Sequence, residues 1–345
     1  MSTFRSLLLS FTFASSVLAQ SRLPSGTIPP TEADVQTCQP VGEQVSEGLG
    51  ANLFVNPRGN AEWETEPTHR GCQQERGLFE SDRAFPNFIG PISNPVLSKD
   101  PRSTTEARLL FINNWIPNEH PLGGGDFQVY ALQLRLALTE RLTLIADKDG
   151  IATLSPGAAP SQTGLLNVAA GLRYLFVRDV ENQFLLSGGF MWEPQSGYAN
   201  VFQSHGDGLL SFFATAAKEH PGCFHSIVNV GFQQPIDSSE NSRFFYTSLH
   251  FDKQVAGWLY PLVELNWFHY TDGGNRGLPP TLGEGDGLLN LGTSGVAGND
   301  LVTVAVGVSA ILSDHVQAGL AYETPISNRK DLLDHRLLVE LILRY

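Results

Sequence analysis

The sequence predicts an all-β fold, a twelve-stranded antiparallel up-and-down transmembrane β-barrel with an irregular N-terminal extension. Three observations predict it: a C-terminal strand of alternating polarity, a run of strand-length segments after residue 105, and connections that alternate between long and short. A strand places successive side chains on opposite faces, so a barrel in lipid can present an apolar outer face around a polar lumen.

The last strand shows the alternation most clearly. Every second residue is apolar: Leu337, Val339, Leu341, Leu343 and Tyr345. The residues between them form a mixed and partly charged set: Arg336, Leu338, Glu340, Ile342 and Arg344. One face of this strand therefore suits lipid, and the other can hold charge in a lumen.

Segments of strand length fill the chain from residue 105 to the end. They are rich in glycine and in β-branched or aromatic residues, and turn-forming residues separate them. The predicted strands are 106–115, 126–138, 140–148, 165–177, 182–193, 207–217, 224–234, 242–252, 257–271, 299–311, 314–324 and 334–345.

Apolar and polar residues alternate within most of these segments. In 126–138 the predicted outward residues are Tyr130, Leu132, Leu134, Leu136 and Leu138, and the inward ones include Gln133 and Arg135. In 165–177 the predicted outward residues are Leu166, Val168, Ala170, Leu172, Tyr174 and Phe176. The segment 207–217 has no clear alternation, so its register stays open.

The connections between these segments alternate in length. The long ones are 117–125, 150–164, 194–206, 235–241 (of intermediate length), 272–298 and 325–333, and short turns lie between them. Bacterial outer-membrane barrels have short periplasmic turns and long extracellular loops, so this order predicts an even strand number with both barrel ends in the periplasm.

Aromatic residues are predicted to gather at both membrane interfaces. Trp115, Trp192, Trp267 and Tyr322 would lie near the outer ends of strands, and Tyr174, Phe176, Phe251, Trp258 and Tyr345 near the periplasmic ends. Such girdles are typical of transmembrane barrels. The alternative is that these are ordinary aromatic residues of strands.

Residues 1–19 have the pattern of a signal peptide, which predicts export. Arg5 precedes an apolar stretch, and Val17 and Ala19 place small residues before a cleavage point. A buried N-terminal helix is the alternative. No later segment is apolar over the ~18 to 20 residues that a transmembrane helix needs. The mean hydropathy of −0.09 fits a soluble protein or a barrel equally.

Residues 20–104 lack sustained periodicity, and proline, glycine and charged residues recur in them. We expect an irregular periplasmic or luminal segment, either a plug in the barrel or a loosely attached tail. Cys38 and Cys72 lie in it and could form a disulfide in an exported chain, which would leave Cys223 over. The alternative is three free thiols.

The signal peptide, the pattern of 105–345 and the ending Leu341-Ile342-Leu343-Arg344-Tyr345 resemble an outer-membrane β-barrel of the transporter type, including the family associated with phenol meta-cleavage operons. The resemblance covers about two thirds of the chain. It implies an outer-membrane location among outer-membrane lipids. It also implies that Leu341, Leu343 and Tyr345 form the assembly signal which the barrel-assembly machinery recognises.

Several other functions are not predicted. The net charge is −13 with no basic cluster, so nucleic acid is not an expected partner. Ser248, His250 and Asp252 share a strand face, but residues two apart on a strand lie ~6 to 7 Å apart, too far for a nucleophile and its base. His205 with Asp207, and His220 with His225, lack a third metal ligand. We therefore expect no enzyme, metal or cofactor.

The most direct hypothesis is passive passage or facilitated uptake of a small solute through a polar lumen. Charged residues predicted to point inward are Glu106, Arg108, Arg135, Arg141, Asp147, Arg173, Glu264, Glu323, Arg336, Glu340 and Arg344. Of these, Arg135, Arg173, Glu264, Arg336 and Glu340 are predicted to tune selectivity, together with the 272–298 loop. Alternatively, the inward charges pair to rigidify the wall of a closed barrel with a structural or surface-binding role. A soluble secreted β protein is a third possibility.

Overall fold

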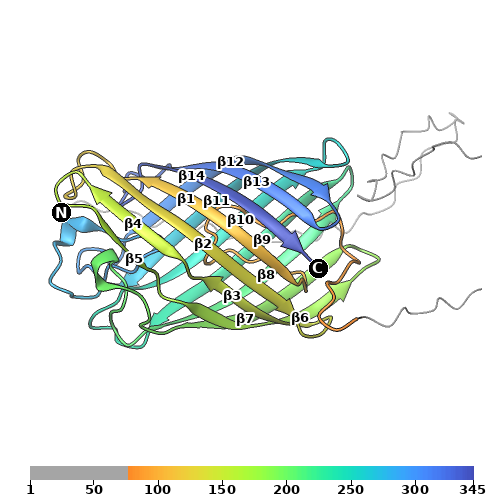
Figure 1. The fold of residues 1–345 in the computed structure, drawn as a ribbon, viewed down its shortest axis with the longest axis horizontal. Helices are drawn as coiled ribbons and strands as arrows, with labels where there is room; N and C mark the ends of the chain where they lie inside the picture. The colour runs from red at the N-terminus through yellow and green to blue at the C-terminus, as the bar shows by residue number, and fades with distance from the viewer. Residues whose placement is uncertain (1–76) are drawn as a thin grey trace, which may run out of the picture. The chain divides into compact units, whose positions relative to one another are not determined.

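The computed structural model describes residues 77–345, and the strands from residue 106 onward form one closed antiparallel sheet (Figure 1). Its strands are β1 (Glu106–Trp115), β2 (Gly125–Ala137), β3 (Leu142–Lys148), β4 (Ile151–Pro156), β5 (Gln162–Leu165), β6 (Ala169–Asp179), β7 (Phe184–Glu193), β8 (Leu209–His220), β9 (Phe224–Pro235), β10 (Arg243–Lys253), β11 (Leu259–Asp272), β12 (Asp300–Ser313), β13 (Val316–Pro325) and β14 (His335–Arg344). Two 3₁₀ turns, η1 (Ala199–Val201) and η2 (Pro280–Leu282), lie in connections.

The sheet closes because β1 pairs with both β14 and β2. Strands β3 and β4 both pair with β2 and follow each other along it, so they form one wall strand with a break. Strands β6 and β5 pair with β3 and β4 in the same way and form the next wall strand. The wall is therefore twelve-stranded, which confirms the predicted fold class.

One predicted connection is wrong. The sequence predicts a long loop over residues 150–164, but these residues contain β4 and all of β5 except Leu165. The chain turns at Gly150, whose φ is +105°, and a Cβ there would lie 2.2 Å from the Tyr130 carbonyl oxygen. Glycine alone fits this close approach, and beyond it the strand resumes over only six residues. Such a short stretch between turn residues gives little periodic signal.

The alternation of faces is largely as predicted. Tyr130, Leu132 and Leu134 are exposed on the outer surface, and Gln133 and Arg135 are buried inside. The open register of 207–217 is settled by β8, where Phe213 points inward and Phe212 outward.

Two individual predictions of facing are wrong. Leu166 is buried, because it lies in the break between β5 and β6, where the alternation of the wall strand is interrupted. Arg141 is exposed, because it lies in the turn between β2 and β3 and donates to the Leu175 and Phe176 carbonyl oxygens.

The two ends of the barrel differ in their connections. The long connections join strands at one end, which we call the long-loop end and which also has the short connection 157–161 between β4 and β5. Turns of two to five residues join the strands at the short-turn end. The C-terminus lies at the short-turn end, next to the start of β1. Leu343 and Tyr345 are exposed and Leu341 is half-buried, and the function of these three residues as an assembly signal stays a prediction.

No helix in the described residues is long and apolar enough to cross a membrane. Cys223, in the turn between β8 and β9, is disulfide-bonded, so the expectation that it would be left over is wrong. The predicted partners Cys38 and Cys72, like the signal peptide 1–19, lie outside the described residues.

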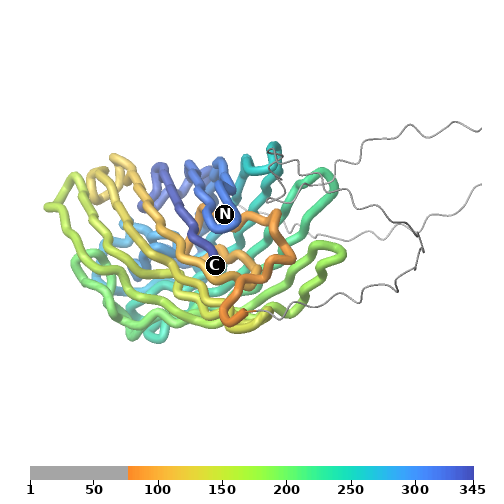
Figure 2. The backbone as a smooth tube through the Cα atoms, turned by 45° about the vertical axis from the view of Figure 1, so that its right-hand side comes forward, coloured from red at the N-terminus to blue at the C-terminus, as the bar shows by residue number. Residues whose placement is uncertain are grey.

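The lumen is occupied from both ends. Residues 81–104, which we call the luminal segment, enter at the short-turn end, turn back inside the barrel and return to β1 (Figure 2). Its apolar residues Ile92, Val96 and Leu97 belong to one buried cluster with the wall and with the connection 273–299. A Cβ on Gly287 of that connection would lie 2.6 Å from Leu97 Cδ1, which shows how closely the two meet.

Candidate functional site

The candidate site is the lumen wall where it contacts the luminal segment. The five residues predicted to tune selectivity all point into the barrel and are all buried: Arg135, Arg173, Glu264, Arg336 and Glu340. Each contacts another residue, on the segment, the wall or a long connection, rather than an open passage. Their effect on selectivity stays a prediction.

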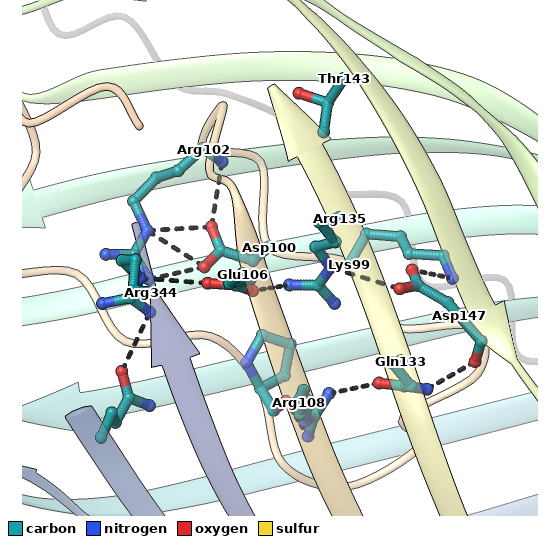
Figure 3. A network of polar contacts seen from close by, with 12 residues as sticks. Lys99, Asp100, Arg102, Glu106, Arg108, Gln133, Arg135, Thr143, Asp147 and Arg344 are labelled. Atoms are coloured by element: carbon teal, nitrogen blue, oxygen red, sulfur yellow. Dashed lines mark hydrogen bonds and ion pairs between the residues drawn. The ribbon is translucent and has the colours of Figure 1, made fainter. Parts of the chain in front are cut away.

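Arg135 of β2 lies in an ion-pair network in the part of the lumen nearer the short-turn end (Figure 3). Its guanidinium contacts Glu106 of β1 at 2.8 Å and Asp147 of β3 at 3.3 Å. Asp147 also contacts the Lys99 ammonium of the luminal segment at 2.8 Å, so one carboxylate joins a wall cation to a segment cation. Glu106 in turn pairs with Arg344, which closes the network across the β1–β14 seam.

Arg173 of β6 holds the returning part of the segment. Its guanidinium donates to the carbonyl oxygens of Asp100 and Arg102 and, at 3.3 Å, to the Thr143 hydroxyl. Buried carbonyls need a donor, and no strand ladder supplies one inside the lumen. Arg173 therefore takes the place of a neighbouring strand for this stretch.

Glu264 of β11 holds the earlier part of the segment, and it accepts hydrogen bonds where Arg173 donates them. Its carboxylate accepts the backbone N–H of Ile92 at 2.8 Å and that of Ser93 at 2.6 Å. Asn266, two residues along β11, donates to the Ser93 hydroxyl at 2.9 Å. A carboxylate that accepts two neighbouring amides fixes the direction of the backbone there.

Glu340 of β14 pairs with Arg108 of β1 at 2.5 Å. Arg108 also donates to the carbonyl oxygens of Pro91 and Ile92, at 3.1 and 3.4 Å. Charges of both signs on the wall thus contact backbone groups of the segment. The segment is thus held through its peptide groups as well as through its own charges, since Lys99 pairs with Asp147 and Asp82 pairs with Arg178 of β6.

Arg336 of β14 lies near the long-loop end. It contacts Asp286 of the 273–299 connection at 2.6 Å and Glu323 of β13 at 3.2 Å. This ion pair fixes the connection inside the barrel mouth. Neighbouring Glu284 accepts hydrogen bonds from the Ser242 hydroxyl and from the backbone N–H groups of Leu291 and Thr293.

The seating of this connection is expected to depend on pH through Glu284. Burial raises the pKa of Glu284 from 4.5 to about 7, against the hydrogen bonds that its carboxylate accepts. Between these values the seated connection binds more protons than an open one, so its stability falls as the pH rises towards about 7. We expect hydrogen exchange of residues 284–293, corrected for intrinsic rates, to quicken over this range. Glu284→Gln should remove the dependence, and identical pH profiles in both proteins would contradict it.

The residues considered for catalysis do not form a nucleophilic site. The Ser248 hydroxyl accepts a hydrogen bond from Asn94, and His250 contacts Glu264 and Asp252 through its two nitrogens. In residues 77–345, no group of three or more histidine, cysteine or acidic residues is arranged to hold a metal ion.

Sequence reasoning missed the contribution of the luminal segment to the site. It placed Glu264 and Arg173 on the wall, but nothing indicated that their partners are the backbone groups of Ile92 and Asp100. Backbone groups are present at every residue, so they leave no sequence signal. The one available signal was Lys99, a lysine in an irregular segment preceding a barrel whose predicted wall carries inward-facing acids.

Comparisons with known proteins find similarity in structure and none in sequence. No protein-family model matches the chain, and no curated protein matches it in sequence. An outer-membrane channel from Pseudomonas putida F1 matches in structure. It is 11% identical, with a TM-score of 0.54, over 75% of this chain and 100% of that one. The NanC porin is 5% identical, with a TM-score of 0.43, over 69% and 99%. At 11% identity the similarity to the channel shows a shared fold.

Proposed function

We propose that this protein is an outer-membrane channel for small solutes, closed by its own luminal segment. The observation that carries the proposal is the manner in which the segment is held. Wall side chains from β1, β6 and β11 bind its peptide groups, whereas the wall strands bind one another through backbone ladders. Water can replace side-chain contacts one at a time, so the segment can leave while the wall stays closed.

In this proposal the short-turn end faces the periplasm and the long-loop end the exterior, as is usual for such barrels. When the segment leaves, Arg135, Arg173, Glu264 and Glu340 would face the passage and act on the charge of the solute. Arg336 would act at the outer mouth together with the 273–299 connection. A link to phenol meta-cleavage operons remains a proposal from resemblance alone.

A closed barrel with a structural or surface-binding role is the second candidate. The occupied lumen favours it, because the wall charges are paired with each other and with the segment. In that case the segment would be a permanent part of the core.

Single-channel conductance in planar bilayers distinguishes the two. We expect rare openings from the full-length protein and frequent, ion-selective steps from a variant lacking residues 81–104. Silence from both proteins, with a heat-modifiable barrel confirmed on gels, would overturn the channel proposal and support the second candidate. Steps of equal frequency from both would show that the segment does not close the lumen.

A further inference from the structure

A chain of buried imidazoles and carboxylates lies directly beneath the luminal segment. His250 of β10 contacts Glu264 through Nδ1 at 2.7 Å and Asp252 through Nε2 at 2.9 Å. The second oxygen of Asp252 contacts His225 Nδ1 of β9 at 2.7 Å. We call these four residues the imidazole–carboxylate array, and each is at most 2% exposed.

The array touches the segment at two points. Glu264 accepts the N–H groups of Ile92 and Ser93, and the Phe88 ring lies 5.1 Å from the His225 ring between centroids. The stretch 88–93 therefore rests on the array along its length. A change in the protonation of the array therefore alters its contacts with the segment or with the strands of the wall.

The geometry fixes the number of protons. A neutral imidazole donates from only one nitrogen, yet both nitrogens of His250 face carboxylate oxygens at hydrogen-bond distance. With Glu264 and Asp252 ionised, His250 must carry both protons. Among the residues that the structure describes, no lysine or arginine forms an ion pair with Glu264 or Asp252, so this imidazolium is the only cation in contact with Glu264, while Asp252 also contacts the His225 imidazole.

The neighbouring lysine, arginine and acidic side chains do not take over the role of the His250 imidazolium. Glu219 of β8 lies 3.6 Å from His225, and Tyr260 of β11 lies beside Asp252. Glu340 of β14 faces Glu264 but is paired with Arg108 of β1, and Arg102 of the segment is paired with Asp100. Apart from the His225 imidazole, which contacts Asp252 and not Glu264, the other titratable groups named here are acids, a phenol or already paired cations.

We propose that His250 is a proton-dependent latch that keeps the luminal segment seated. Loss of its second proton would place a nitrogen lone pair against a carboxylate oxygen, leave buried Glu264 without a cation and leave Asp252 with His225 as its remaining imidazole partner. Buried carboxylates then require water, which can enter only if the stretch 88–93 moves away. The inference rests on the proposed closure of the channel by the segment and adds its regulation by alkaline pH.

Hydrogen exchange of the full-length protein in detergent micelles, read on peptides covering 88–97, tests the latch without any need for conductance. After correction for intrinsic rates, protection in the wild type should fall by about tenfold or more between about pH 7 and about pH 9. His250→Gln should be unprotected at both values. His250→Lys keeps a cation over this range and should be protected at both. His315→Gln, a control at an exposed turn histidine bonded to the Arg344 carbonyl, should follow the wild type.

Equal protection of the wild type at both pH values would overturn the latch, and so would equal protection in wild type and His250→Gln. If His250→Gln does not fold, the contrast between wild type and His250→Lys decides. Loss of protection without any conductance from the deletion variant would retain the latch and reject the channel. Conductance from the deletion variant, together with protection of 88–97 that is independent of pH, would support the channel and reject the latch.

Discussion

Asp147→Asn is expected to unseat the luminal segment. The Asp147 carboxylate is fully buried between the Lys99 ammonium and the Arg135 guanidinium. An amide in its place carries no charge, so the buried Lys99 and Arg135 cations would lose the carboxylate that lies between them. Removal of one partner from a buried ion pair typically costs about 3–5 kcal/mol. Arg135 keeps Glu106, so the cost falls on Lys99, which can reach water only by leaving the lumen.

The expected result is an increase of about 100-fold in channel opening in planar bilayers, which corresponds to about 3 kcal/mol. Lys99→Met in the same protein should restore closure, because the segment then has no ammonium left without its carboxylate partner. Asp179→Asn, at the end of β6 where the carboxylate accepts hydrogen bonds from Asn182, is the control and should behave as wild type. If the double variant opens as often as Asp147→Asn alone, the contact with Lys99 does not hold the segment.

Arg173→Met is expected to free the returning part of the segment. The variant leaves the carbonyl oxygens of Asp100 and Arg102 without their charged donor. Hydrogen bonds to charged groups contribute about 1.5–3 kcal/mol each, so about 3 kcal/mol or more should be lost. We expect faster hydrogen exchange of peptides covering 97–104 and more frequent channel opening.

Arg141→Met provides a matched control for this variant. Arg141 also donates to two carbonyl oxygens, those of Leu175 and Phe176, but it lies in an exposed turn and makes these contacts outside the lumen. It should leave exchange in 97–104 unchanged. If both variants speed exchange to the same extent, the effect comes from general loosening of the barrel and not from the contacts of Arg173.

The sequence predicted the faces of the wall well. In β2 and β14 the inward and outward residues follow directly from alternation, because the period of two is a local property of an extended chain. The same principle explains the errors. Where Gly150 and the break at Leu166 interrupt the strand, the alternation is lost and the prediction fails with it.

The content of the lumen could not be predicted in this way. Ile92 and Glu264 are 172 positions apart and meet only because the closed barrel surrounds the segment. The segment has neither helix nor strand, so its contacts have no period. Of the five predicted selectivity residues, the sequence identified which face they occupy but not what they bind.

The sequence by itself determined a twelve-stranded barrel with an apolar surface and a charged interior, because strand periodicity and loop lengths are set by neighbouring residues. Only the tertiary structure decided that the interior is occupied. Only the tertiary structure showed that His250 lies between two carboxylates on different strands. The contact with Glu264 follows from the register of β10 against β11, in which the two residues lie directly opposite each other, and alternation within one strand does not record that register.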